Sequence, residues 1–189
     1  MKISKINRFL LAASFTAYFS ESLFGPIYAI FVKNIGGDVL AAGASYGIFA
    51  IVGGLFIFTV GRTNFFKTHS RGMVVLGFGM LALGGIGYLI VRNSEQLFLL
   101  QIFMGIADGI LEPSWNGIFS AGLSEEQSIH FWSIFGAGQK IAIGIGGLIG
   151  GLLVTIWSFQ TLFIIVTFLN TIATILSARI LWIKKKNYS

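Results

Sequence analysis

Apolar residues form six long runs along this chain, and short polar segments separate them. A helix that crosses a bilayer needs about 20 mostly apolar residues in succession, and each run is about that long. The runs predict membrane-spanning helices at Phe9–Val32, Val39–Val60, Met73–Val91, Leu97–Leu123, Phe131–Ile156 and Phe159–Ile183. The predicted connections are Lys33–Asp38, Gly61–Gly72, Arg92–Gln96, Ser124–His130 and a tight turn at Trp157–Ser158. We therefore expect an all-α polytopic membrane protein with a single transmembrane domain over residues 1–189.

The composition of the chain narrows the functional classes. Its mean hydropathy is +0.84, and only 11% of its residues are charged, whereas an average soluble domain carries about 25%. The absence of cysteine excludes disulfides, Cys-ligated zinc and a thiol nucleophile. The sequence shows no nucleophile–base pair, metal-ligand cluster or phosphate-binding loop. We expect no enzyme activity, no metal and no cofactor.

The distribution of Lys and Arg predicts the orientation in the membrane. With six spans both termini share a side, which carries Lys2, Lys5, Arg8, Arg62, Lys67, Arg71, Arg179, Lys184, Lys185 and Lys186. The opposite side carries Lys33 and Arg92. Because cytoplasmic loops are enriched in Lys and Arg, we expect a cell-membrane protein with both termini in the cytoplasm. The same placement accounts for the net charge of +6 and favours anionic lipid, not nucleic acid, as the partner of the basic segments.

Two stretches 87 residues apart indicate an internal repeat. Each has an acidic residue, a proline five positions later and an aromatic residue two positions after the proline. The first span contains Glu21-Ser-Leu-Phe-Gly-Pro26-Ile-Tyr28, and the fourth contains Asp108-Gly-Ile-Leu-Glu-Pro113-Ser-Trp115. A repeat of three helices places its second copy inverted across the membrane. We expect a 3+3 inverted repeat, with repeat 1 at about residues 7–92 and repeat 2 at about residues 94–183, as in many secondary transporters.

The prolines and glycines within the spans have predicted structural roles. Pro26 and Pro113 each remove a backbone hydrogen bond and should kink their helices. Glycines allow close approach of membrane helices. The predicted helix-packing glycines are Gly105, Gly109, Gly146, Gly147, Gly150 and Gly151.

Four charged residues lie deep within the predicted spans: Glu21, Asp108, Glu112 and Lys140. A charge at the bilayer centre costs about 2.5–3.5 kcal/mol on insertion scales, so such residues are functional candidates. Glu112 and Lys140 have similar depths on consecutive spans, and we expect them to form an ion pair, with a Glu21–Lys140 pair as the alternative. The remaining carboxyl groups are candidates to bind a proton or a cationic substrate, because burial and a neighbouring like charge favour the neutral acid. A purely structural role in holding helices together is the other interpretation.

Four further polar or aromatic residues are candidates to line a cavity. They are Tyr28, Trp115, Asn116 and Gln139. Tyr28 and Trp115 lie beside the two prolines and could stack on a substrate cation. Packing within the helical core is the alternative for both rings.

Three segments together resemble motifs of the Major Facilitator Superfamily. Gln101-Ile-Phe-Met-Gly105-Ile-Ala-Asp-Gly109 is similar to the Arg-x3-Gly-x3-Gly motif of the fourth helix, with Gln in place of Arg. Ala142-x3-Gly146-Gly147-x2-Gly150-Gly151 is similar to the glycine motif of the fifth helix but lacks its proline. Gly61-Arg62-Thr-Asn-Phe65-Phe66-Lys67 is similar to the loop after the second helix, with Phe65 where the family has Asp. The chain resembles one six-helix half of the usual twelve, as in short half-size prokaryotic members.

The resemblance implies an arrangement and a function. Helices one and four would line a central cavity, two and five would flank the interface between halves, and three and six would lie outermost. The expected function is secondary active transport of a small molecule by alternating access, proton-coupled, in a homodimer of halves. A heterodimer with another six-helix half is the alternative assembly. The alternative functions are a non-transporting membrane assembly module and a truncated half of a longer transporter.

Overall fold

The computed structural model describes residues 4–121 and 125–183, and every regular element in these ranges is a helix. The elements are α1 (Lys5–Phe24), η1 (Gly25–Ile27), α2 (Tyr28–Asn34), α3 (Val39–Gly61), α4 (Asn64–Ile90), α5 (Ser94–Ser120), α6 (Glu125–Ile156), α7 (Phe159–Ala178) and η2 (Arg179–Trp182). The prediction of an all-α protein is confirmed. The predicted span end at Leu123, together with Lys2 and the Lys184–Lys186 run, lies outside the described residues.

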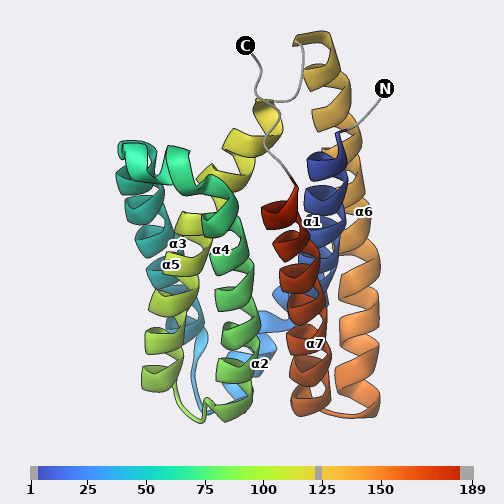
Figure 1. Ribbon diagram of the computed structural model, residues 1–189. Helices are drawn as coiled ribbons and strands as arrows, with labels where there is room; N and C mark the ends of the chain where they lie inside the picture. The colour runs from blue at the N-terminus through green and yellow to red at the C-terminus, as the bar shows by residue number, and fades with distance from the viewer. Residues whose placement is uncertain (1–3, 122–124, 184–189) are drawn as a thin grey trace.

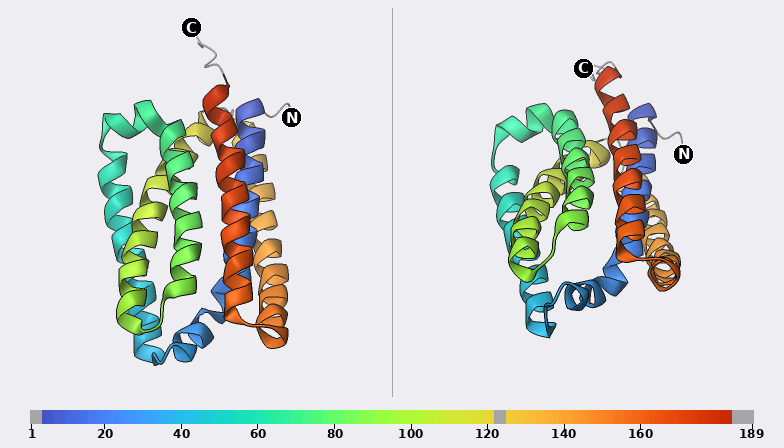
Figure 2. Two further views of the ribbon diagram at one scale, coloured as in Figure 1. Left: turned by 60° about the horizontal axis from the view of Figure 1, so that its bottom comes forward. Right: turned by 90° about the horizontal axis from the view of Figure 1, so that it is seen from below.

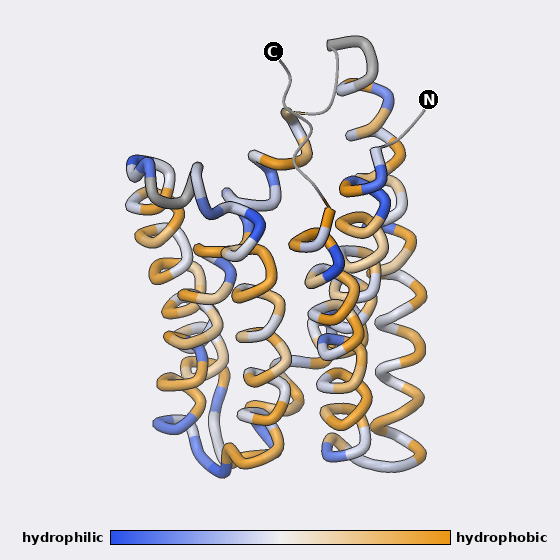
Figure 3. The backbone as a smooth tube through the Cα atoms, viewed as in Figure 1, coloured by the Kyte–Doolittle hydropathy of each residue, from blue (hydrophilic) through white to orange (hydrophobic). Residues whose placement is uncertain are grey.

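The long helical segments of the chain run back and forth along one direction (Figure 1). Five of them, α3 to α7, are long and apolar enough to cross a membrane. The sixth is the first span, which a 3₁₀ turn divides into α1 and α2. The first turn of α1 and the last turn of α7 lie at the same end of the molecule, which we call its terminal end (Figure 1). Figure 3 shows apolar residues along the whole length of these helices, with hydrophilic residues concentrated at the two ends. The chain is a multi-pass membrane protein.

Two helices begin earlier than the hydropathy pattern predicts. Helix α4 begins at Asn64 and α6 at Glu125, so most of the predicted connections at 61–72 and 124–130 are helical. Hydropathy locates the edge of the hydrocarbon layer, whereas a helix can continue into water because its backbone hydrogen bonds are internal. Helix α4 has non-helical backbone angles at His69 (φ −107°, ψ 15°), close to where its apolar part begins.

Capping residues fix the short connections between the helices. The side chains of Asp38, Asn93 and Ser158 accept hydrogen bonds from the backbone N–H groups three residues later, at 2.7, 3.0 and 3.2 Å. Such N-caps satisfy donors that the first turn of a helix leaves free. Gly36, at φ +84°, provides the left-handed turn before α3. The tight turn predicted at Trp157–Ser158 is confirmed.

The helices form two groups of three, α1 with α6 and α7, and α3 with α4 and α5 (Figure 2). Contacts between α4 and α7 join the groups. The first three spans run in the opposite direction to their counterparts among the last three (Figure 1). The first span, α1, packs against the fifth and sixth spans, α6 and α7. The fourth span, α5, packs against the second and third spans, α3 and α4. The first helix of each set of three consecutive spans thus contacts the other two helices of the other set. This exchange gives the two sets equivalent surroundings, as in the 3+3 inverted repeat of a major facilitator half.

Two apolar clusters fill the interior at different depths. One lies toward the terminal end of the bundle and is built around Leu10, Phe78, Trp115, Phe119, Phe131 and Phe135. The other lies toward the opposite end and is built around Phe24, Phe31, Tyr88, Leu97, Phe163 and Val166. The layer between them contains the acidic residues predicted as a site.

Candidate functional site

Three carboxylates from two helices come together at mid-depth. Glu21 lies on α1, and Asp108 and Glu112 lie one turn apart on α5 and therefore share a helical face. Asp108 interacts electrostatically with both Glu21 and Glu112. Glu21 and Glu112 are exposed and Asp108 is half-buried, so the group faces an open side of the bundle. The fold thus joins acidic residues that are 87 or more positions apart in the sequence.

Tyr18 links the carboxylates to α6. It lies one turn before Glu21 on α1 and interacts electrostatically with all three carboxylates and with the Gln139 side chain. Its ring contacts Phe135 at a centroid distance of 5.7 Å. A phenol can donate a hydrogen bond to a carboxylate and accept one from an amide. Gln139 was predicted from the sequence as a cavity residue and Tyr18 was not, although the i, i+3 spacing of Tyr18 from Glu21 could have indicated it.

The structure contradicts the predicted ion pair between Glu112 and Lys140. Lys140 is exposed, and within the described part of the chain it forms no salt bridge. It is also absent from the electrostatic partners of Glu21, so the alternative pair does not form either. The cause is helical rotation. Gly138 and Gln139 face α1, and each further residue turns by about 100° at 3.6 residues per turn. Equal depth therefore did not bring the two charges together.

Small residues bring α3 against α5 beside Asp108. A Cβ atom added to Gly53 would lie 3.6 Å from Oδ2 of Asp108. One added to Gly105 would lie 2.7 Å from the carbonyl oxygen of Phe49, and one at Gly109 would collide with Phe56. The two glycines of α5 thus lie within the α3–α5 contact.

The glycines of α6 make a corresponding contact with the first span. A Cβ atom at Gly146 would collide with Ser22, and one at Gly150 would collide with the backbone of Leu23. At Gly147 it would lie 3.0 Å from Cγ of Pro26. Gly151 has no neighbour within 4 Å and lies outside this contact.

The two prolines have different local consequences. Pro26 lies in the 3₁₀ turn that ends α1, and the Gly25 N–H still donates to the Glu21 carbonyl. Pro113 lies within α5, which continues as one helix to Ser120. The end of α5 veers toward α1 and α6 (Figure 1).

Trp115 packs in the aromatic cluster at this end of α5. Its ring stacks on Phe119 and Phe135 at 4.9 and 5.1 Å and meets Trp132 edge-on at 5.9 Å. The ring is buried, and its indole Nε1 has no hydrogen-bond partner among the described residues. Of the two roles predicted for Trp115, the structure shows packing within the helical core. Asn116 beside it is half-buried, and its cavity role stays a prediction.

Tyr28 belongs to a hydrogen-bond network that joins four helices. Gln101 Nε2 donates to the hydroxyl oxygens of Tyr28 at 2.7 Å and Tyr88 at 3.0 Å. The Tyr28 hydroxyl donates to Ser45 Oγ at 2.6 Å. The network fixes α2 to the α3–α4–α5 group. From the sequence, Gln101 was identified only as a replacement for the Arg of the family motif, and its partners were not predicted.

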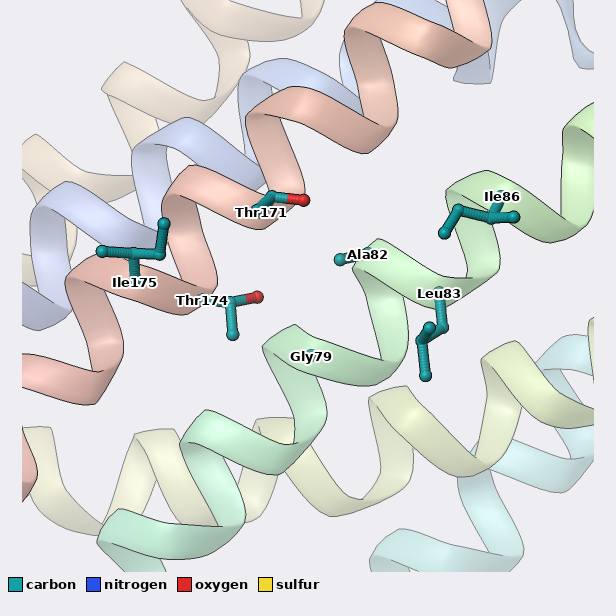
Figure 4. A pocket seen from close by; sticks show the side chains of 7 residues that line it. All are labelled: Gly79, Ala82, Leu83, Ile86, Thr171, Thr174 and Ile175. Carbon is teal, nitrogen blue, oxygen red and sulfur yellow. The ribbon is translucent and has the colours of Figure 1, made fainter.

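A separate groove of about 230 Å³ lies between α4 and α7 (Figure 4). Its lining residues are Gly79, Ala82, Leu83, Ile86, Thr171, Thr174 and Ile175. The two threonine hydroxyls donate to carbonyl oxygens of their own helix at 2.8 Å. Because the groove has no charged group and no free hydroxyl, the carboxylates are the better candidate site.

The family profile described as "Major Facilitator Superfamily" matches residues 10–189. The chain belongs to this superfamily. Its members are transporters and not enzymes, so the expectation that this chain is not an enzyme is confirmed at the level of the family. The carboxylates lie on the first and fourth spans, which the family resemblance identified as the helices that line the transport cavity.

The curated relatives of this major facilitator chain differ in length. It is 27% identical over 160 residues to the uncharacterized MFS-type transporter YitZ of Bacillus subtilis, covering 88% of that protein. It is 23% identical over 176 residues to the uncharacterized MFS-type transporter MJ1560 of Methanocaldococcus jannaschii, covering 45% of it. It is 25% identical over 137 residues to the proton-coupled antiporter flippase LtaA of Staphylococcus aureus, covering 32% of it. The chain therefore spans less than half the length of the last two relatives and most of the length of the first.

Proposed function

We propose that this chain is a half-transporter that moves a small molecule across the cell membrane by alternating access, coupled to protons, as a homodimer. The observation that carries the proposal is the group of three carboxylates at mid-depth, Glu21, Asp108 and Glu112, which has no cation beside it among the described residues. Acidic residues inside a membrane bundle are rare and mark ion and proton pathways.

The carboxylates suit proton coupling for an electrostatic reason. Like charges that lie together in a water-poor layer favour protonation of at least one member. Conversely, a cation or an opening to water favours release of the proton. A site that alternates between these surroundings can bind a proton on one side of the membrane and release it on the other. The relative LtaA, named as a proton-coupled antiporter flippase, supports this type of coupling.

The exposure of two of the carboxylates supports a homodimer. Glu21 and Glu112 are exposed, and contact with lipid hydrocarbon would be costly for both. A second copy related by a two-fold axis would cover this side and place like loops together. We also propose that both termini are cytoplasmic, since Lys5, Arg8, Arg62 and Arg71 lie at the terminal end of the bundle.

A flux measurement tests the transport function. The purified protein is placed in liposomes that enclose a proton-sensitive dye, and compounds are screened for flux that depends on an imposed pH gradient. We expect hits whose flux is lost in Glu21→Gln or Asp108→Asn while the variants still fold. Glu95→Gln is the matched control, because Glu95 is an exposed acid in the first turn of α5.

A structural role for the acids would give the opposite pattern. If flux in both variants equals that of the wild type, the carboxylates are not the coupling site. If the variants lose their assembly in detergent before they lose flux, the acids hold helices together.

A further inference from the structure

We propose that Lys140 of each copy in the proposed homodimer enters the carboxylate group of the other copy, across the outer faces of α3 and α6, the helices that the family resemblance places beside the interface between halves. This inference rests on the proposed homodimeric transporter and names its contact surface and its charge pairing.

The first observation is the exposure of α3 and α6. Only 11% of the apolar stretch of each is buried, against 33–39% in α4, α5 and α7. The two helices lie at opposite edges of the bundle (Figure 2). In the plane of the membrane, they are the helices that a neighbouring copy would meet.

The second observation is that α3 and α6 each have glycines that do not pack against another helix of the same chain. Gly53 of α3 and Gly146 and Gly150 of α6 pack within the chain. At other glycines of the same helices an added Cβ atom would meet no atom within 4 Å; these include Gly43, Gly47 and Gly54 on α3 and Gly136, Gly144 and Gly151 on α6. Small residues at such spacings allow membrane helices to pack closely. On each helix, one set of glycines therefore packs within the chain, and another set makes no contact within it.

The third observation is charge complementarity. Lys140 is exposed and lies one turn from both Gly136 and Gly144, on the open face of α6. A lysine in the middle of a span requires a partner or a watery cavity, and the described part of its own chain supplies no carboxylate within salt-bridge distance. The carboxylates Glu21, Asp108 and Glu112 in turn have no cation beside them among the described residues. The charges match between two copies and not within one.

Symmetry places these groups at the same depth. A two-fold axis along the membrane normal leaves the depth of every residue unchanged. Lys140 lies near the middle of the apolar part of α6, and Asp108 lies near the middle of α5. Each lysine therefore meets the partner's acids and not the loops. This arrangement forms two equivalent pairs and leaves none of the four charged positions facing lipid.

Charge reversal tests the pairing. The association constant is measured by single-molecule photobleaching of labelled protein in lipid vesicles over a range of dilutions. We expect Lys140→Glu and Glu112→Lys each to lower the constant about tenfold, within the range of measured pair couplings, and the double variant to recover most of the loss. Lys33→Glu, which changes an exposed lysine at a helix end, should leave it unchanged. Failure of the double variant to recover overturns the pairing.

Two glycine variants test the same contact surface if a charge variant does not fold. Gly144→Leu should abolish dimerisation. Gly117→Leu, at an exposed glycine of α5 that also has no neighbour within 4 Å, should not. Equal effects of the two variants overturn the proposed surface.

The same vesicles separate this inference from the proposed function. Proton-dependent flux in a dimer that is insensitive to every one of these variants overturns the inference and leaves the transporter intact. A wild-type chain that stays monomeric at all densities, or that pairs only with a different six-helix half, overturns the second copy as the occupant. A sensitive dimer without flux supports the contact surface and contradicts the transport function.

Discussion

Gly105 offers the sharpest test of the packing between α3 and α5. An added Cβ atom would lie 2.7 Å from the Phe49 carbonyl oxygen, 3.0 Å from Cβ of Val52 and 3.1 Å from the Gly53 nitrogen. All three atoms belong to the backbone of α3 or are directly bonded to it, so no side-chain rotation relieves the crowding. Gly105→Ala therefore requires α3 to move away from α5.

The magnitude follows from two opposing effects. Overpacking a well-packed contact costs about 1–3 kcal/mol, and alanine in place of glycine in a helix gains about 1 kcal/mol. We expect Gly105→Ala to lose about 1 kcal/mol, or roughly 2–4 °C in Tm for a chain of this size. Gly117→Ala, whose added Cβ atom meets nothing within 4 Å, should instead gain about 1 kcal/mol from the same propensity.

The assay is thermal unfolding of both variants in one detergent, followed by circular dichroism. The two changes have the same chemistry and opposite expected signs, so detergent effects cancel in the comparison. Gly105→Leu extends the series and should lower the stability by about 3 kcal/mol. Equal shifts of Gly105→Ala and Gly117→Ala would show that α3 and α5 are not in the close contact described.

Two further predictions concern buried polar groups. Gln101→Leu removes the hydrogen bonds to Tyr28 and Tyr88, and at about 0.6 kcal/mol for each membrane hydrogen bond it should lower the free energy of unfolding by about 1 kcal/mol in an SDS titration; additive losses in Gln101→Leu combined with Tyr28→Phe would contradict the network. Trp115→Phe keeps an aromatic ring in the cluster and removes an N–H group that has no partner among the described residues, which offsets part of the lost packing, so Tm should fall far less than in Trp115→Ala, which should cost about 3–5 kcal/mol. A loss in Trp115→Phe as large as that in Trp115→Ala would show that the indole nitrogen has a stabilising partner.

The spans were predictable from sequence because the bilayer imposes a single length on every crossing segment. The polar turns at Asp38, Asn93 and Ser158 follow from the capping chemistry of their side chains. Glu21 and Asp108 were selected for their cost in hydrocarbon, and the structure brings them together because the two sets of three helices exchange partners. In each case a strong physical rule acts on a few adjacent residues.

The direction of a side chain was the information that the sequence lacked. Similar predicted depth was not enough to pair Glu112 with Lys140, because one residue of helical rotation separates Gln139, which faces α1, from Lys140, which does not. The same applies to Gln101, whose partners Tyr28 and Tyr88 lie on other helices, 73 and 13 positions away. Such pairs depend on how helices are rotated about their axes, and hydropathy along one chain does not determine that rotation.

The two prolines show how one neighbouring residue changes the outcome of a shared motif. Glycine precedes Pro26 and glutamate precedes Pro113. Glycine is about 1 kcal/mol less favourable than alanine in a helix interior, whereas glutamate is one of the better helix formers. The first span therefore divides into α1 and α2, whereas α5 continues as one helix. The division falls where the first span changes its neighbours. Helix α1 packs against α6 and α7, and Tyr28 of α2 is hydrogen-bonded into the α3–α4–α5 group. A continuous helix would fix the orientation of one group directly to the other, and the 3₁₀ turn at Gly25–Ile27 interrupts the first span between them.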